Sequence, residues 1–327
     1  MTDFCSQYSR DINEPLAGTG GHPGRNLLLS WPAGRWTTSF WQAKDMTEAE
    51  QTVCSKVLER GRRINLIDRK GEVPEGEHRL YLMPEGQVIQ LPRERLVETL
   101  EALLSDTANA LPFAPTERPL VLCCTHGKKD RCCAKFGNAA YRALQAENHQ
   151  QGNPLDLWQA THLGGCRLAA TVLALPARHK YGRLAPEQVP DFVQQVKAQR
   201  IFVPGFRGSP GLLPAQQCAE VAALAWLEAQ GEAAVVEPRA IEESDTEQRI
   251  TVDWVNPATR AAGCLEVQCR PVTRVRYGTC ADMDTGPVSA RSWEATAVRR
   301  AARPMTTGGN HDDGHAFADR QPIPLTR

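Results

Sequence analysis

The chain has 327 residues, of which 41% are hydrophobic and 23% are charged, as is usual for a globular protein of two or three domains. Lysine and arginine together number 38, as do aspartate and glutamate, so the formal net charge is zero. This balance argues against a general binder of nucleic acid or of membrane surfaces. The sequence shows no secretory signal and no stretch that approaches about 18 apolar residues, so we expect a cytoplasmic protein without membrane insertion.

Residues 1–110 predict a first α/β unit. An apolar run over 26–31 predicts a buried strand, and apolar residues at helical spacing predict a helix over 47–62. A short strand over 64–67 follows. Residues 80–83 and 88–91 predict a hairpin, which is followed by a helix over 93–105.

Residues 111–205 repeat this plan. The predicted elements are a strand over 119–122, a helix over 133–147, a strand over 157–160, a hairpin of 171–175 with 180–184, and a helix over 187–199. Matching prolines lie 92 positions apart at Pro84 and Pro176, and 94 apart at Pro92 and Pro186. We interpret the two halves as a divergent repeat of one strand–helix–strand–hairpin–helix unit, an order that is thioredoxin-like.

Residues 206–283 predict a smaller α+β unit, with a helix over 214–230 and strands over 233–236, 249–254 and 263–277. From residue 284 the chain becomes polar and irregular, so we expect 284–327 to be a mostly disordered tail. The predicted fold class is therefore α/β. It has two thioredoxin-like units, the first of them degenerate and without ligands, then the small C-terminal α+β unit and the tail.

Five of the eleven cysteines lie in two stretches that each follow a predicted strand, namely CCTHGKKDRCCA (123–134) and THLGGCR (161–167). In a reducing compartment, clustered cysteines are more typical of metal or catalytic sites than of disulfides. Thiolates and imidazoles are ligands of iron–sulfur clusters and of zinc. Strand ends gather at one edge of an α/β layer, so we expect the two loops to form one site.

These two stretches resemble the sucrase/ferredoxin-like family, which contains thioredoxin-like [2Fe–2S] ferredoxin domains. Residues 181–184 match as well, residues 14–19 match more weakly, and the resemblance runs from about residue 5 to about residue 220. It implies a [2Fe–2S] cluster with Cys124 and Cys133 on one iron. Such ferredoxins have Cys-x-x-x-Cys in the second loop, and many family members have His-x-x-x-His. This chain has His162 and Cys166, so the implied ligand set is a mixture of three cysteines and one histidine.

The mixed ligand set has an electrostatic consequence. A neutral imidazole in place of a thiolate makes the cluster less negative and easier to reduce. Potentials are about −400 mV for all-cysteine plant-type clusters and about −150 to +300 mV for two-histidine centres, so we expect an intermediate value. The second ring nitrogen can titrate, so we also expect a midpoint potential that falls as the pH rises.

The sequence leaves some nearby assignments open. Cys132 is a possible substitute for Cys133, whereas strand alternation should point Cys123 away from Cys124 and into the core. His126 is expected to shape the loop or lie near the cluster. The basic loop residues form either a solvated loop or a docking patch for an acidic redox partner: Lys128, Lys129, Arg131. We expect core or incidental roles for the remaining cysteines: Cys5, Cys54, Cys218, Cys264, Cys269, Cys280.

The sequence therefore predicts an electron-transfer protein, a redox carrier rather than a stand-alone enzyme, whose donor or acceptor is an unidentified redox protein. Two alternatives stay open. A Cys₃His set can hold structural Zn²⁺ in a non-redox interaction module, although the eight residues between Cys124 and Cys133 suit a larger group. A thioredoxin-like thiol oxidoreductase fits the fold class but lacks a Cys-x-x-Cys at the start of a helix. The oligomeric state is not predicted.

Overall fold

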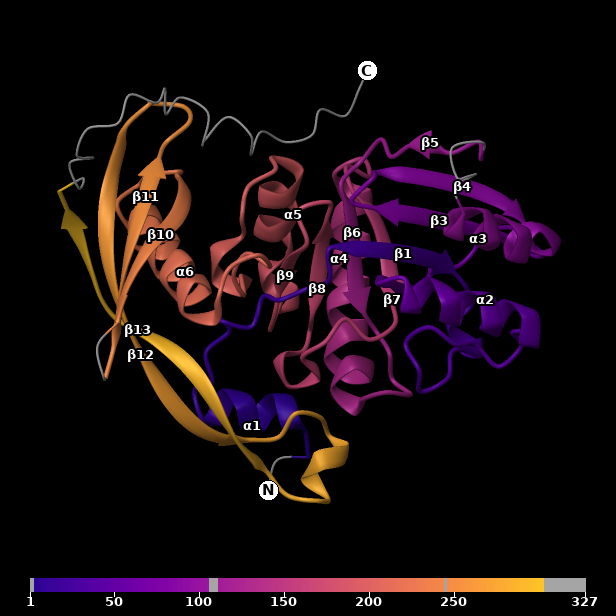
Figure 1. The fold of residues 1–327 in the computed structure, drawn as a ribbon, viewed down its shortest axis with the longest axis horizontal. Coiled ribbons are helices and arrows are strands. Elements are labelled where there is room, and N and C mark those ends of the chain that lie inside the picture. The colour runs from indigo at the N-terminus through magenta and orange to yellow at the C-terminus, as the bar shows by residue number, and fades with distance from the viewer. Residues whose placement is uncertain (1–2, 106–110, 244–245, 303–327) are drawn as a thin grey trace.

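The computed structural model describes residues 3–105, 111–243 and 246–302. It contains a nine-stranded mixed sheet with helices against it and a separate four-stranded sheet (Figure 1). Within the described residues, none of the helices has both the length and the apolar character needed to cross a bilayer.

The first half of the large sheet has the strand order β4-β3-β1-β2. Strands β1 and β2 are parallel, and the hairpin β3–β4 adds to β1 antiparallel. The elements are β1 (Arg25–Ser30), α2 (Glu48–Glu59), β2 (Arg62–Asp68), β3 (Glu77–Met83), β4 (Gln87–Pro92) and α3 (Leu96–Leu104). Thr47 caps the N-terminus of α2: its hydroxyl accepts from Glu50 N while the Glu50 carboxylate accepts from Thr47 N.

The second half repeats this arrangement with the order β7-β6-β8-β9. Strands β6 and β7 are parallel, and β8–β9 is an antiparallel hairpin on the other side of β6. The elements are β6 (Leu120–Cys124), α4 (Asn138–Gln150), β7 (Asp156–Ala160), β8 (Val172–Leu175), β9 (His179–Tyr181) and α5 (Val189–Lys197). Both halves therefore have the predicted order, and the thioredoxin-like α/β fold class is confirmed.

The two halves join edge to edge. Strand β2 pairs antiparallel with β7 through Ile67 opposite Ala160 and Asp68 opposite Gln159, and the two-residue strand β5 (Ala114–Pro115) extends the far edge beside β4. Figure 1 shows β1, β3 and β4 running across the direction of β6–β8, so the combined sheet is strongly twisted.

Alternate side chains along each strand point to opposite faces of the sheet and enter three different cores. Leu27 and Leu29 face the core that contains α2 and α3, while Val121 and Cys123 face the core that contains α4 and α5. The opposite faces of both halves share a third core, which we call the shared core: Leu28, Ile67, Tyr81, Met83, Leu120, Leu122, Cys124, Cys133, Trp158, Ala160, Leu163, Cys166, Leu173, Leu175. Three of the four predicted ligands are therefore buried between the two halves.

The C-terminal unit is a four-stranded antiparallel sheet in the order β10-β11-β12-β13, with α6 (Pro214–Ala229) packed against it. Its strands are β10 (Val235–Glu243), β11 (Gln248–Val255), β12 (Ala262–Arg276) and β13 (Val288–Ala301). Apolar residues from both layers meet at Leu224, Ile250, Val252 and Val267. The predicted α+β character of this unit is confirmed.

The predicted start of an irregular tail at residue 284 is wrong. Strand β13 pairs with β12 from Arg276 opposite Val288 to Cys264 opposite Ala301, so this unit continues to residue 301. Its sequence hides the strand because β13 lies at the sheet edge, is mostly exposed and carries one large buried side chain, Trp293. The rest of the predicted tail, residues 303–327, lies outside the described residues.

A short helix that the sequence analysis missed, α1 (Cys5–Asp11), lies beside the long β12–β13 hairpin (Figure 1). Arg274 Nη1 donates to the Ile12 carbonyl at 3.0 Å, and Arg276 Nε lies 3.4 Å from a Glu14 carboxylate oxygen. The rings of Tyr8 and Tyr277 pack edge to face with centroids 4.8 Å apart. These contacts bring the first and last described segments together.

Candidate metal centre

The first cysteine loop connects β6 to α4. Cys124 is the last residue of β6, and Cys133 begins a π-helical turn (Cys133–Gly137) that leads into α4. The Cys124 and Cys133 Sγ atoms lie 3.5 Å apart. As strand alternation predicts, Cys123 points to the opposite face of the sheet, where its Sγ lies 3.5 Å from the Gly137 carbonyl oxygen.

Gly137 sets how closely the π-helical turn approaches the end of β6. A Cβ atom at this position would lie 2.0 Å from the Cys124 carbonyl oxygen, well inside the contact distance of two heavy atoms. Only glycine allows this approach. π-helical turns occur frequently at functional sites, and the position of this one at a cysteine pair fits that tendency.

The second loop, after β7, bends at two glycines. Gly164 and Gly165 have φ of +91° and +83°, which side chains disfavour, and a Cβ at Gly165 would lie 3.0 Å from the Arg207 guanidinium. Arg207 Nη1 also donates to the Gly164 carbonyl at 3.1 Å. This bend turns both ends of the loop to one side, where His162 Nδ1 lies 3.3 Å from Cys166 Sγ.

The structure brings all four predicted ligands together as two pairs. Cys133 and Cys166 lie within 4.8 Å of each other and of an Asp130 oxygen. Among the described residues, that group includes neither Cys124 nor His162, although each lies close to one of its cysteines. The donor atoms therefore form a series in the order Cys124, Cys133, Cys166, His162. This series is too long for all four donors to surround a single ion. Their assignment as iron ligands stays a prediction.

For His162 and Cys124, the site favours the form that binds metals, whereas contact with the Cys124 and Cys166 thiols raises the pKa of Cys133 well above its usual value. Burial lowers the pKa of His162 to about 4, and the nearby charges of Arg63 and Lys129 add to this effect, so its imidazole is neutral at pH 7. The contact with the Cys133 thiol lowers the pKa of Cys124 despite burial, and backbone N–H groups of His126 and Leu163 contribute. Neutral imidazole and thiolate are the ligating forms.

His126 uses both ring nitrogens on the backbone. Its Nε2 donates to the Thr37 carbonyl at 2.7 Å, and its Nδ1 accepts from the His162 amide at 3.2 Å. This assigns the neutral tautomer protonated at Nε2, and burial lowers the pKa of the ring below its usual value. His126 therefore shapes the site, as expected, by connecting the first half of the chain to the second loop.

Residues of the first half also form hydrogen bonds with the second loop. Arg63 Nη2 donates to the His162 carbonyl at 2.5 Å, and Asn65 Nδ2 donates to Thr161 Oγ1 at 3.2 Å. The Thr161 hydroxyl in turn donates to the Phe40 carbonyl at 2.6 Å. The half without ligands thus fixes the backbone on which His162 is carried.

The basic residues of the first loop divide into two kinds. Lys128 connects the loop to the first half of the chain, because its Nζ donates to the Trp36 carbonyl at 2.5 Å and to the Gly34 carbonyl at 3.3 Å. Lys129 and Arg131 are exposed to solvent.

Cys132 does not lie with Cys124. Its Sγ is 3.5 Å from Cys5 Sγ and 3.3 Å from Cys280 Sγ, so the structure places it in a second group of thiols. Cys5 and Cys280 are buried, in agreement with the expected core roles, but they lie against Cys132 and not apart from the cysteine loop. Sequence reasoning missed this group because its members are 127 and 148 positions from Cys132. The only local signal was an additional cysteine directly before Cys133.

The sucrase/ferredoxin-like family model matches residues 16–208, which is more than half of the chain. The chain belongs to this family. Both cysteine loops lie inside the matched range, whereas Cys5 and Cys280 lie outside it. No curated protein matches the chain.

Solved structures similar to this family member include those of the thioredoxin-like [2Fe–2S] ferredoxin from Aquifex aeolicus. One is 17% identical, covers 30% of this chain and 100% of the ferredoxin, and has a TM-score of 0.26. A second, of the wild-type ferredoxin, is 17% identical, with coverages of 28% and 97% and a TM-score of 0.25. Because these TM-scores are low, the assignment of the thioredoxin-like fold rests on the strand order of the two halves and not on these structures.

Proposed function

We propose that this protein transfers electrons through one [2Fe–2S] cluster, with Cys124 and Cys133 on one iron and His162 and Cys166 on the other. The observation that carries this proposal is the meeting of two donor pairs from two strand-end loops, almost entirely inside the shared core. The bound cluster supplies a one-electron redox couple.

The surroundings of the four donors suit a group that gains negative charge. Backbone N–H groups of His126 and Leu163 point at Cys124, and such donors raise the potential of a thiolate-bound cluster. The positive charges of Arg63 and Lys129 act on His162. Together these groups favour the reduced state, in which the site carries one more negative charge.

Structural zinc fits the donor types but fits their arrangement less well. Tetrahedral zinc with bonds of about 2.0–2.3 Å requires four donors within about 4 Å of one another. Cys124 and His162 lie at opposite ends of the donor series, outside the one 4.8 Å group that Cys133 and Cys166 form with Asp130. The longer arrangement favours a two-iron cluster over one ion.

A thiol oxidoreductase also fits less well. Cys124 and Cys133 are 2% and 1% exposed, so a protein disulfide has no direct access to either sulfur.

For the redox partner, we propose an acidic protein that docks over the exposed side chains of Lys129 and Arg131. Lys129 acts electrostatically on His162, which is half-buried, so this face lies close to the site. Complementary charge would accelerate docking at low ionic strength.

The visible absorption spectrum of anaerobically purified protein tests the proposal. We expect a brown protein whose visible bands bleach on addition of dithionite. Cys124→Ala and Cys133→Ala should each lose these bands, whereas Cys132→Ala, altered in the second thiol group, should keep them. A colourless wild-type protein that carries zinc and no iron would overturn the proposal.

A further inference from the structure

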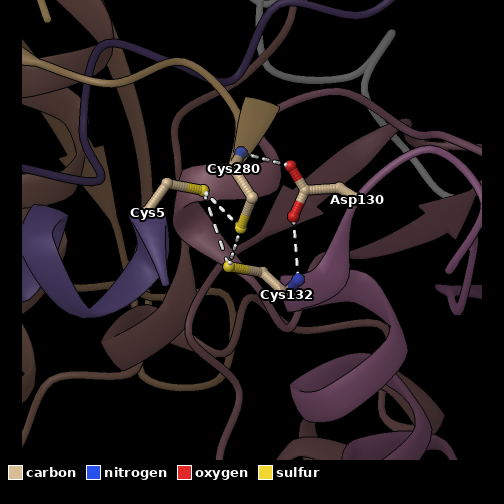
Figure 2. Close-up of side chains that lie close together, drawn as sticks. All are labelled: Cys5, Asp130, Cys132 and Cys280. Atoms are coloured by element: carbon tan, nitrogen blue, oxygen red, sulfur yellow. Dashed lines mark hydrogen bonds between the residues drawn. The ribbon is translucent and has the colours of Figure 1, made fainter. Parts of the chain in front are cut away.

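Three cysteines from distant parts of the chain form a compact second thiol group (Figure 2). Cys5 begins α1, Cys132 precedes the π-helical turn, and Cys280 lies in the connection between β12 and β13. Their Sγ atoms are separated by 3.5 Å for Cys5 and Cys132, 3.3 Å for Cys132 and Cys280, and 3.6 Å for Cys280 and Cys5. The three sulfurs therefore form a nearly equilateral triangle.

Asp130 completes this group on the loop side. Its Oδ1 accepts from Cys132 N and its Oδ2 accepts from Cys280 N, both at 2.8 Å (Figure 2). One of its oxygens and the three sulfurs all lie within 4.8 Å of one another. Each carboxylate oxygen keeps a second lone pair when it accepts one hydrogen bond. An oxygen donor is thus available beside the sulfur triangle.

The group is buried among apolar side chains. Cys5 and Cys132 are 0% exposed, Cys280 is 3% exposed and Asp130 is 4% exposed. Ala169 packs against the cysteines, with Phe4 and Tyr277 at the periphery. A surface hollow of about 270 Å³, lined in part by Asp130 and Cys280, adjoins the group and offers an entry path for a small ion.

The size of the triangle matches the coordination shell of zinc. Tetrahedral zinc with Zn–S bonds of about 2.3 Å requires sulfurs about 3.8 Å apart. The observed separations of 3.3–3.6 Å are close to this value. A disulfide would instead require two of the sulfurs to approach to about 2.05 Å and would leave the third thiol without a partner.

We propose that these three cysteines and Asp130 bind one zinc ion. Binding of Zn²⁺ would release to solvent the protons that the three cysteines carry, because thiolates are the ligating form. The ion would connect α1 and the β12–β13 connection to the loop that carries Cys133. Its three sulfurs differ from those of the proposed cluster, although Asp130 also lies within 4.8 Å of Cys133 and Cys166.

Metal analysis of the full chain, purified anaerobically, tests the proposal. We expect one zinc ion per chain in the wild-type protein. Cys280→Ala should lose the zinc and retain the visible bands of the proposed cluster. Cys54→Ala, which removes a buried cysteine of α2, is the matched control and should retain both.

Zinc K-edge X-ray absorption of the wild-type protein makes the test independent of variant folding. The expected shell has three sulfurs at about 2.3 Å and one oxygen at about 2.0–2.2 Å. A zinc shell that contains a histidine nitrogen would place the metal at His162 and overturn this proposal and the cluster proposal together. Wild-type protein that binds iron but no zinc, or that forms a disulfide among the three cysteines, would overturn the zinc site alone.

Discussion

His162 is the residue that separates this site from an all-cysteine one. Its Nδ1 faces Cys166, and its backbone is held by Arg63 and by the His126 ring. The resemblance to the sucrase/ferredoxin-like family implied His162 as a ligand, because His162 and Cys166 have the spacing of the second ligand pair of that family. The position of His126 was less predictable, since its roles depend on Thr37 in the other half of the chain.

The change His162→Cys should lower the midpoint potential, because a thiolate replaces a neutral ligand. From the range between all-cysteine and two-histidine centres, we expect a fall of roughly 100 mV or more. The wild-type potential should fall as the pH rises, by up to about 59 mV per unit for one proton per electron, and the variant should lose this dependence. Redox titration from pH 6 to pH 9 measures both effects.

The matched control is His149→Cys, which alters an exposed histidine of α4. It should leave both the potential and its pH dependence unchanged. A wild-type potential that is flat across this pH range would show that the histidine does not couple proton and electron transfer.

At the scale of secondary-structure elements, the π-helical turn positions Cys133. The sequence predicted a helix from residue 133, but α4 begins at Asn138 and the preceding turn is π-helical. The spacing of apolar residues does not distinguish an α-helix from a π-helix here. The hydrogen bonds of the two helices span four and five residues, and the turn has only five residues. The close approach of Gly137 to β6 depends on tertiary packing and could not be predicted.

Gly137→Ala should remove most of the bound iron although no ligand changes. The added Cβ would lie 2.0 Å from the Cys124 carbonyl, so the end of β6 or the turn must move. Iron content and visible absorbance per chain measure the effect. Gly211→Ala, at an exposed glycine with no heavy atom within 4 Å of the new Cβ, should keep full iron content. Equal iron in the two variants would show that this approach is not needed.

At the scale of the whole molecule, the site depends on both halves of the chain. The repeated order of strands and helices was predictable, because each half has the same succession of apolar runs and prolines. Their edge-to-edge junction was not, since β2 and β7 pair at only two positions. Strand β13 was missed because a strand that pairs along an exposed edge has little apolar pattern. The second thiol group was missed because its contacts join residues 127 or more positions apart, which leaves no local pattern.

Arg63 shows how the half without ligands should tune the site. Arg63→Met removes a positive charge whose field acts on both His162 and Cys124. The reduced state should lose on the order of 1 kcal/mol of stabilisation, which lowers the midpoint potential by roughly 40 mV. Lys56→Met, at an exposed position of α2, is the control and should leave the potential unchanged. A potential equal to wild type in Arg63→Met would contradict this role.

Acid should destabilise the fold through His22, which is 7% exposed. Burial, together with the charge of Lys180, lowers the pKa of His22 to about 3 in the folded state. Below pH 6.5 the unfolded state therefore binds a proton that the folded state does not, and the free energy of unfolding falls as the pH falls. The loss is about 1.4 kcal/mol per pH unit, or at most about 2 kcal/mol between pH 6.5 and pH 5.

Denaturant unfolding of wild type and His22→Gln at pH 7.5 and pH 5 measures this contribution. The variant should lose less stability than wild type on acidification, because glutamine does not titrate. Equal losses in the two proteins would mean that His22 is protonated in the folded state near its ordinary pKa.

Mössbauer spectroscopy of ⁵⁷Fe-enriched, oxidised protein tests the central claim most directly, because it reports the ligands of each iron separately. Two irons on Cys124 with Cys133 and on His162 with Cys166 should give two doublets of equal area and different isomer shift, since nitrogen and sulfur ligands differ in covalency. In His162→Cys the two doublets should converge. A single iron environment in the wild-type protein, or protein without iron, would contradict the account.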